Sequence, residues 1–288
     1  MPTARRALAS ESADVARAVI DGVALEYEDS GVGEPVVFIH GAFIADAFRP
    51  LLAEPALAER FRLISYHRRG HGGSAHVEGS VTIEDGAGDC LALLSFLGVP
   101  HAHVVGHSYG ANVALQMALD APDVVRTLGV LEAGLFVGES APLYRKALLQ
   151  ARDRFAEVGA RVAVDEFLGM RWPAYRTHLD RVLPGAFEQA VADAATFFDA
   201  ELPGGLDWQF EAAEARRIAQ PALVVLGEES VALHPRFAET YRLLLEWLPE
   251  AEGFVLPGAT HFLQMMSPRP LAEALSEFLG RHAFARPG

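Results

Sequence analysis

Short apolar runs alternate with helix-forming segments along most of the chain. The apolar runs that are typical of buried parallel strands cover residues 35–40, 61–66, 103–106, 125–131, 222–226 and 253–256. Helical patterns follow over residues 82–97, 111–119, 237–247 and 271–282. Because parallel strands need a crossover connection, usually a helix, this alternation predicts an α/β fold with a mostly parallel, doubly wound sheet.

A second pattern opens the chain. Residues 15–20 and 23–28 read as two strands joined at Asp21-Gly22, a dipeptide that favours a two-residue hairpin turn. We therefore expect an antiparallel hairpin at one edge of the sheet.

Residues 134–218 break this rhythm, since they are nearly all helical in pattern. They hold 11 of the 26 aromatic residues, with breaks at Pro173, Pro184 and Pro203. We interpret them as a helical cap inserted into a core of residues 14–133 and 219–288, with residues 1–13 as an N-terminal extension. The aromatic rings either pack the cap's own core or line a pocket above the sheet, and both can hold together.

Composition excludes several classes of protein. Cys90 is the only cysteine, so the chain is not a disulfide-stabilised scaffold, and no apolar stretch approaches the ~20 residues of a membrane-spanning helix. A net charge of −14 argues against nucleic acid or anionic membranes as partners. The basic Arg5-Arg6 pair is not followed by the apolar run of a signal peptide. Together with the free thiol, this predicts a cytoplasmic protein.

The run Gly106-His107-Ser108-Tyr109-Gly110 carries the clearest chemical signal. It has the pattern Gly-x-Ser-x-Gly and lies between a predicted strand and a predicted helix, where a sharp turn exposes the serine hydroxyl. Side chains at the two glycines would collide with the neighbouring strand and helix. Ser108 is therefore the candidate nucleophile.

With this motif in place, the chain resembles the α/β-hydrolase fold family over about residues 14–284. Three further runs support the resemblance: Phe38-Ile-His40-Gly41-Ala42, Tyr66-His-Arg-Arg-Gly-His-Gly-Gly-Ser74, and Leu256-Pro-Gly-Ala-Thr-His261. The resemblance implies that His261 is the catalytic base, because the family places its histidine last along the chain. His67, His71 and His76 are expected to be solvated or structural.

The acid of the triad departs from the family's common pattern. The usual aspartate position, three residues after Gly227, is occupied by Ser230, which cannot stabilise an imidazolium as a carboxylate does. Glu132 ends the strand at residues 125–131 and so lies at the edge where ligands bind in parallel sheets. In this respect the chain resembles fungal zearalenone lactonases. We expect Glu132 to be the acid, with Glu229 or Glu228 as the alternatives.

The resemblance also implies an oxyanion hole built from two backbone amides. One belongs to Tyr109, after the nucleophile, and the other to Ala42, with Phe43 as the alternative. The residues expected to line a substrate pocket are His40, Phe43, Phe136, Trp172 and Phe262.

These expectations predict a cofactor-independent serine hydrolase, without a metal, that cleaves a carboxylic ester or lactone of an apolar small molecule. An alternative is a carbon–carbon bond hydrolase of a diketone-type ring-cleavage product, for which Arg145, Arg171 or Arg176 could hold an acidic substrate. An alternative of another class is a non-catalytic small-molecule receptor. The sequence leaves the oligomeric state open.

Overall fold

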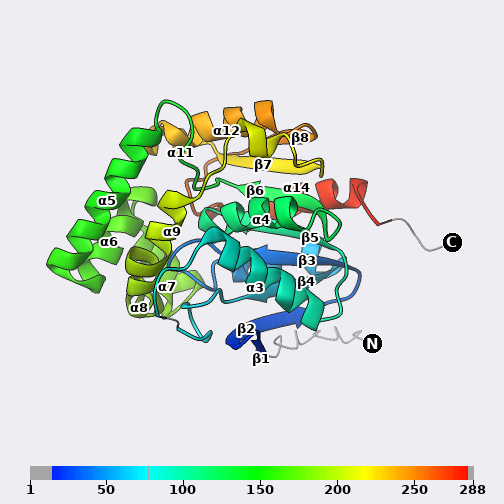
Figure 1. The fold of residues 1–288 in the computed structure, drawn as a ribbon, viewed down its shortest axis with the longest axis horizontal. Helices are drawn as coiled ribbons and strands as arrows, with labels where there is room; N and C mark the ends of the chain where they lie inside the picture. Colours follow the sequence, from blue (N-terminus) through cyan, green and yellow to red (C-terminus); the bar gives the residue numbers. More distant parts are fainter. Residues whose placement is uncertain (1–14, 77, 285–288) are drawn as a thin grey trace, which may run out of the picture.

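An eight-stranded sheet forms the centre of the computed structural model, which describes residues 15–76 and 78–284 (Figure 1). The extension expected over residues 1–13 lies outside this part of the chain. The sheet order is β1-β2-β4-β3-β5-β6-β7-β8. The strands are β1 (Ala16–Ile20), β2 (Val23–Ser30), β3 (Glu34–Ile39), β4 (Phe61–Tyr66), β5 (Ala102–His107), β6 (Val125–Leu131), β7 (Ala222–Gly227) and β8 (Ala251–Leu256). Pairs from β4 to β8 are parallel, which confirms the predicted fold class.

The two antiparallel pairs lie at one edge, where β1 pairs with β2 and β2 with β4. Asp21 and Gly22 join β1 to β2, and both have positive φ, 49° and 83°. A two-residue turn with positive φ at both positions matches the twist of a hairpin. The predicted hairpin is thus confirmed.

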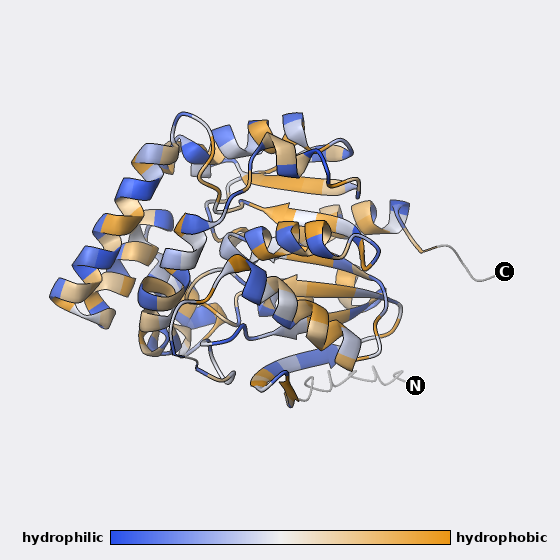
Figure 2. Ribbon diagram, in the orientation of Figure 1, coloured by the Kyte–Doolittle hydropathy of each residue, from blue (hydrophilic) through white to orange (hydrophobic). Residues whose placement is uncertain are grey.

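Helices cover both faces of the sheet. One face carries α3 (Ile83–Phe96), α4 (Tyr109–Asp120), α10 (Ala212–Ala215) and α12 (Arg236–Trp247). The other carries α1 (Arg49–Leu52), α2 (Pro55–Ala58), α13 (Leu263–Met266) and α14 (Pro268–Arg281). The central strands are hydrophobic along their length, as expected for strands buried on both faces (Figure 2).

A further group of helices lies between β6 and β7 in the chain and gathers at one end of the sheet (Figure 1). It consists of α5 (Ala141–Val158), α6 (Ala160–Arg171), α7 (Tyr175–Val182), α8 (Ala186–Ala192), the π-helix η1 (Thr196–Glu201) and α9 (Leu202–Asp207). All fall within the predicted cap. Their apolar cluster includes Phe167 and Phe198 and also takes in Phe43 and Phe262 from the core. A short α11 (Ser230–Leu233) follows β7.

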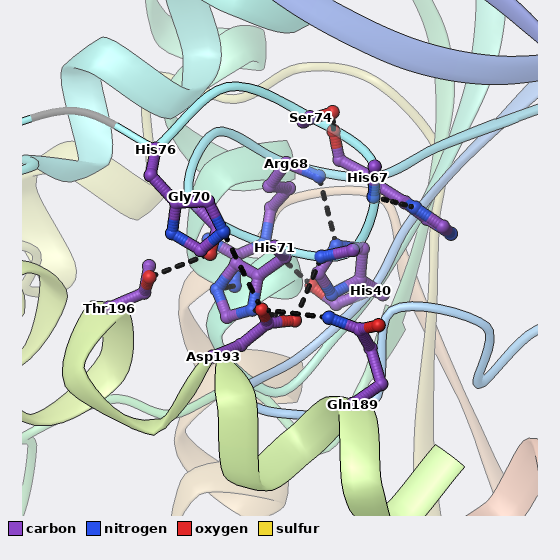
Figure 3. A network of polar contacts seen from close by, with 12 residues as sticks. His40, His67, Arg68, Gly70, His71, Ser74, His76, Gln189, Asp193 and Thr196 are labelled. Atoms are coloured by element: carbon purple, nitrogen blue, oxygen red, sulfur yellow. Dashed lines mark hydrogen bonds and ion pairs between the residues drawn. The ribbon is translucent and has the colours of Figure 1, made fainter. Parts of the chain in front are cut away.

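Polar contacts join these helices to the turn after β4 (Figure 3). The Gly72 amide donates to Asp193 Oδ2 at 2.8 Å, and Thr196 Oγ1 donates to the Gly70 carbonyl at 2.6 Å. Arg68 forms a buried ion pair with Glu201. The turn after β4 therefore anchors the helical segment beside the end of β3.

Within the described residues, no helix is both long and apolar enough to cross a membrane. The thiol of Cys90 is buried, and burial raises its pKa to about 12.

Candidate active site

Ser108 occupies a strained turn between β5 and α4. Its backbone has φ 53° and ψ −116°, a conformation that non-glycine residues rarely adopt. A Cβ at Gly106 would lie 2.2 Å from the Gly110 carbonyl oxygen, and one at Gly110 would lie 2.1 Å from the Ile39 carbonyl oxygen. The expected need for both glycines is confirmed by this crowding.

His261 lies in the loop between β8 and α13 and reaches Ser108 across 153 residues of chain. The Ser108 hydroxyl is 3.0 Å from His261 Nε2, a distance at which it donates a hydrogen bond. The His107 ring holds the loop in place: its Nε2–H donates to the His261 carbonyl at 2.7 Å, and its Nδ1 accepts from Gln264 at 3.2 Å. Burial lowers the pKa of His107 to about 3, so this ring acts as a neutral support.

Glu132 stands directly after β6, with φ 45°. Its Oε2 accepts from His261 Nδ1 at 2.7 Å, and its Oε1 accepts from the Gly227 amide at 2.7 Å. The alternative Glu228 is exposed and accepts from the Gly258 amide at 3.1 Å, and Glu229 is also exposed. The structure thus brings Glu132, and neither alternative, to the far nitrogen of His261.

Burial shifts the pKa values of both His261 and Glu132. It lowers the pKa of His261 well below its ordinary value, with the charges of Arg236 and Arg171 adding to the effect. It raises the pKa of Glu132, while the Gly227 amide and the charge of Arg236 partly offset the increase. The imidazole is therefore unprotonated at neutral pH, the form that can accept a proton.

Two backbone amides expected to form an oxyanion hole lie near Ser108. Ala42 and Tyr109 line the same cavity as Ser108, and within the described residues neither amide donates a hydrogen bond. A Cβ at Gly41 would lie 3.1 Å from Ser108 Cβ, which places the turn after β3 directly against the serine. His40 supports this turn, since its Nδ1–H donates to the Gly41 carbonyl at 2.7 Å.

Only part of the expected substrate pocket is where the sequence placed it. A cavity of about 40 Å³ contains Ser108 and His261 and is lined by Phe136 and Phe262. His40, Phe43 and Trp172 do not line it. His40 belongs to the polar network of Figure 3. Phe43 is buried among three other rings, those of Phe167, Phe197 and Phe198. Trp172 packs against Phe262, with 5.5 Å between the ring centres.

A larger cavity of about 300 Å³ adjoins the first but does not include Ser108. The two share Tyr144, Phe167 and Arg171 in their walls, and Arg236 lines the larger one. Arg236 is not among the site residues predicted from the sequence. A signal existed: it shares the buried face of the helix 236–247 with Thr240 and Leu244, where a cation is unusual.

No group of three or more His, Cys, Asp or Glu side chains suited to a metal ion occurs in residues 15–76 and 78–284.

Comparison with known proteins agrees with this architecture. The chain is 28% identical over 274 residues to a 2-(acetamidomethylene)succinate hydrolase of Mesorhizobium japonicum, covering 91% of this chain and 94% of the relative. An esterase of Thermogutta terrifontis superposes with a TM-score of 0.80 at 21% identity, covering 94% of this chain and all of that one. An enol-lactonase of Burkholderia xenovorans LB400 gives 0.73 at 22% identity, covering 92% and 100% of the two chains. The two structures show the fold, and the relative from Mesorhizobium japonicum supports a general hydrolase activity. Residues 36–274 match the model of the alpha/beta hydrolase family, and the chain belongs to that family.

Proposed function

We propose that the protein is a cofactor-independent serine hydrolase that cleaves a carboxylic ester or lactone of a small molecule through an acyl-enzyme. One observation carries this proposal. Glu132, His261 and Ser108 form a continuous chain of hydrogen bonds, 2.7 Å and 3.0 Å long, that ends in a cavity. A serine hydroxyl is a weak nucleophile until a positioned base removes its proton, and this chain supplies the base.

In the first step Ser108 Oγ attacks the substrate carbonyl while its proton moves to His261 Nε2. The Nδ1–H of His261 donates to Glu132, whose negative charge stabilises the imidazolium that forms. These two hydrogen bonds hold the His261 ring in the tautomer with the proton on Nδ1, which leaves Nε2 free to accept the proton of Ser108.

The carbonyl oxygen becomes an oxyanion as the tetrahedral intermediate forms. The unpaired amides of Ala42 and Tyr109 supply two donors for that charge. Collapse of the intermediate breaks the bond to the leaving alkoxide, which takes the proton from His261. Water then attacks the acyl-enzyme by the same route, with His261 again as base, and releases the acid and free Ser108.

The rings of Phe136, Phe197 and Phe262 line the cavity beside the nucleophile and favour an apolar substrate body. An amide is a second candidate for the scissile bond. The relative from Mesorhizobium japonicum is named for a substrate that carries an acetamido group, and the same nucleophile and base serve ester and amide cleavage.

Labelling with an aryl phosphonate tests the proposal directly. We expect a single adduct on Ser108, detected by mass spectrometry of the digested protein, and a burst of nitrophenol from an activated aryl ester. The Ser108→Ala variant should give neither. A wild-type protein that binds ligands but yields no adduct and no product would support the receptor alternative. Hydrolysis of a vinylogous diketone without any ester cleavage would support the carbon–carbon hydrolase.

A further inference from the structure

Two arginines from different parts of the chain meet in the wall of the larger cavity. Arg171 ends α6, in the helical segment between β6 and β7, and Arg236 begins α12, in the core. Arg171 also lines the small cavity that holds Ser108. The side chain of Arg171 would therefore lie between a ligand group in the larger cavity and the Ser108 hydroxyl.

Neither guanidinium has an acidic partner within the described residues. Arg236 is 3% exposed; its Nη1 donates to the Ala133 carbonyl at 3.2 Å, and its buried Nη2 has no hydrogen-bond partner. Among the described residues, the hydrogen-bond acceptor of Arg171 is the Phe167 carbonyl, at 3.0 Å. Of the described residues in the cavity wall, Glu166 is the one carboxylate, and it is paired with Arg154 at 3.0 Å.

The surroundings hold both cations in fixed positions without neutralising them. The guanidinium carbon of Arg236 lies 4.2 Å from the ring centre of Tyr144 and 3.9 Å from that of Phe237. Arg171 lies 3.4 Å from the ring centre of Phe167. Burial lowers the pKa of Arg171 to about 10, and the charge of Arg236 contributes. Arg236 is buried and Arg171 is half-buried. The charge of Arg236 acts on Glu132, but neither guanidinium forms an ion pair with a carboxylate in the described part of the chain, so both keep donors for an anionic ligand.

The ring of His234 supplies a third donor beside the two guanidinium groups. His234 Nδ1 accepts from the Arg236 amide at 3.1 Å, so in the neutral ring Nε2 carries the proton. That Nε2 is buried and has no hydrogen-bond partner in the described part of the chain, and His234 lines the larger cavity.

We propose that Arg171 and Arg236, with His234 beside them, bind a carboxylate group of the substrate. Guanidinium groups present donors in a planar fork that matches a carboxylate, and the aromatic stacking pre-organises them. The inference rests on the proposed hydrolase function and narrows it. The substrate has an apolar body with the scissile carbonyl at Ser108 and a free carboxylate held at the far side of Arg171.

The test compares two esters that differ only at the end remote from the reacting carbonyl. Mono-4-nitrophenyl adipate carries a free carboxylate, and 4-nitrophenyl hexanoate carries a methyl group in its place. We expect the wild-type protein to prefer the adipate ester at least tenfold in kcat/KM. Arg171→Met and Arg236→Met should each reduce the ratio of the two kcat/KM values about tenfold or more, and the ratio cancels any general loss of folded enzyme.

Arg176→Met is the matched control. Arg176 lies in the same helical segment but is paired with Asp165 at 3.1 Å and lines neither cavity, so the ratio should stay at the wild-type value. Hydrolysis of both esters with a ratio that neither substitution changes would overturn the carboxylate site and leave the hydrolase proposal intact.

A second measurement distinguishes failure of the hydrolase proposal from failure of the carboxylate site. If neither ester is cleaved, calorimetric titration with adipate still measures the site. Binding that is lost in Arg236→Met and kept in Arg176→Met would support it, and the absence of binding to the wild-type protein would overturn it.

Discussion

Two clusters of charged side chains lie beside Ser108, and they differ in whether their arginines are paired with a carboxylate. On one side Arg68, 2% exposed, pairs with fully buried Glu201 and donates to the carbonyls of His40 and Gly41 at 3.0 Å and 3.1 Å. On the other side Arg171 and Arg236 have no acidic partner among the described residues.

The paired cluster has a structural consequence. Through the His40 and Gly41 carbonyls, Arg68 holds the turn that carries the Ala42 amide, and its guanidinium lies 4.6 Å from the ring centre of Tyr109. The turn that carries the Ala42 amide is therefore held by a charge that is already paired, and the same charge contacts the side chain of Tyr109. Charges that are not satisfied within the protein are left for a ligand. This contrast separates supporting residues from binding residues.

Glu132→Gln should give the largest effect. Glu132 is the buried carboxylate that accepts from His261 Nδ1, and a neutral amide would neither stabilise the imidazolium nor fix its tautomer. We expect kcat to fall by about 10³–10⁴, on the order of 4–5 kcal/mol in the barrier. Steady-state kinetics with an aryl ester measure this. Glu229→Gln is the matched control, and an inactive Glu229→Gln beside an active Glu132→Gln would reassign the acid.

Breaking the paired cluster should give the next largest effect, on stability. Arg68→Met leaves Glu201 buried without its partner, which costs about 3–5 kcal/mol in the free energy of unfolding. The double variant Arg68→Met, Glu201→Leu removes the unpaired charge and should recover most of that loss. Urea denaturation measures both. Equal losses in the single and double variants would show that the ion pair itself is not what the turn depends on.

Substitution in the unpaired cluster of Arg171 and Arg236 should have little effect on stability. Arg236→Met removes a buried cation that forms no ion pair with a carboxylate among the described residues, so the free energy of unfolding should change by no more than about 1 kcal/mol and can increase. The same urea titration compares it with Arg68→Met. A loss as large as that of Arg68→Met would mean that Arg236 is a structural residue.

The sequence predicted the elements whose signals are local. The strand runs, the Asp21-Gly22 turn and the glycines around Ser108 each act through neighbouring residues, and the structure has all of them. The sequence also predicted Glu132 as the acid, because a residue at the end of a strand lies at a known edge of the sheet, and Glu132 contacts His261 in the structure.

The pocket was less predictable because it is made by packing between segments that are distant in the chain. Of the three arginines between residues 134 and 218 that the sequence offered for an acidic substrate, Arg145 donates to the Leu206 carbonyl and Arg176 pairs with Asp165, while Arg171 has no acidic partner among the described residues. No sequence pattern distinguishes these three environments. Phe43 and Trp172 were expected in the pocket because they are aromatic, yet both are buried in the shared apolar cluster.

The smallest expected effect concerns pH. Burial and the charges of Arg236 and Arg171 lower the pKa of His261, and Glu132 and the neutral His107 ring complete its surroundings. With a neutral ester, kcat/KM should therefore stay constant from neutral pH into the acid range and fall only where the hydrogen-bonded pair of His261 and Glu132 takes up a proton. Removing a nearby cation makes protonation easier, so Arg236→Met should raise the pKa of His261 and move this acid limb to higher pH. Arg176→Met should leave the limb in place. Profiles of kcat/KM against pH decide the matter: an acid limb that Arg236→Met does not shift would place this cation outside electrostatic reach of the base, even if it binds the substrate.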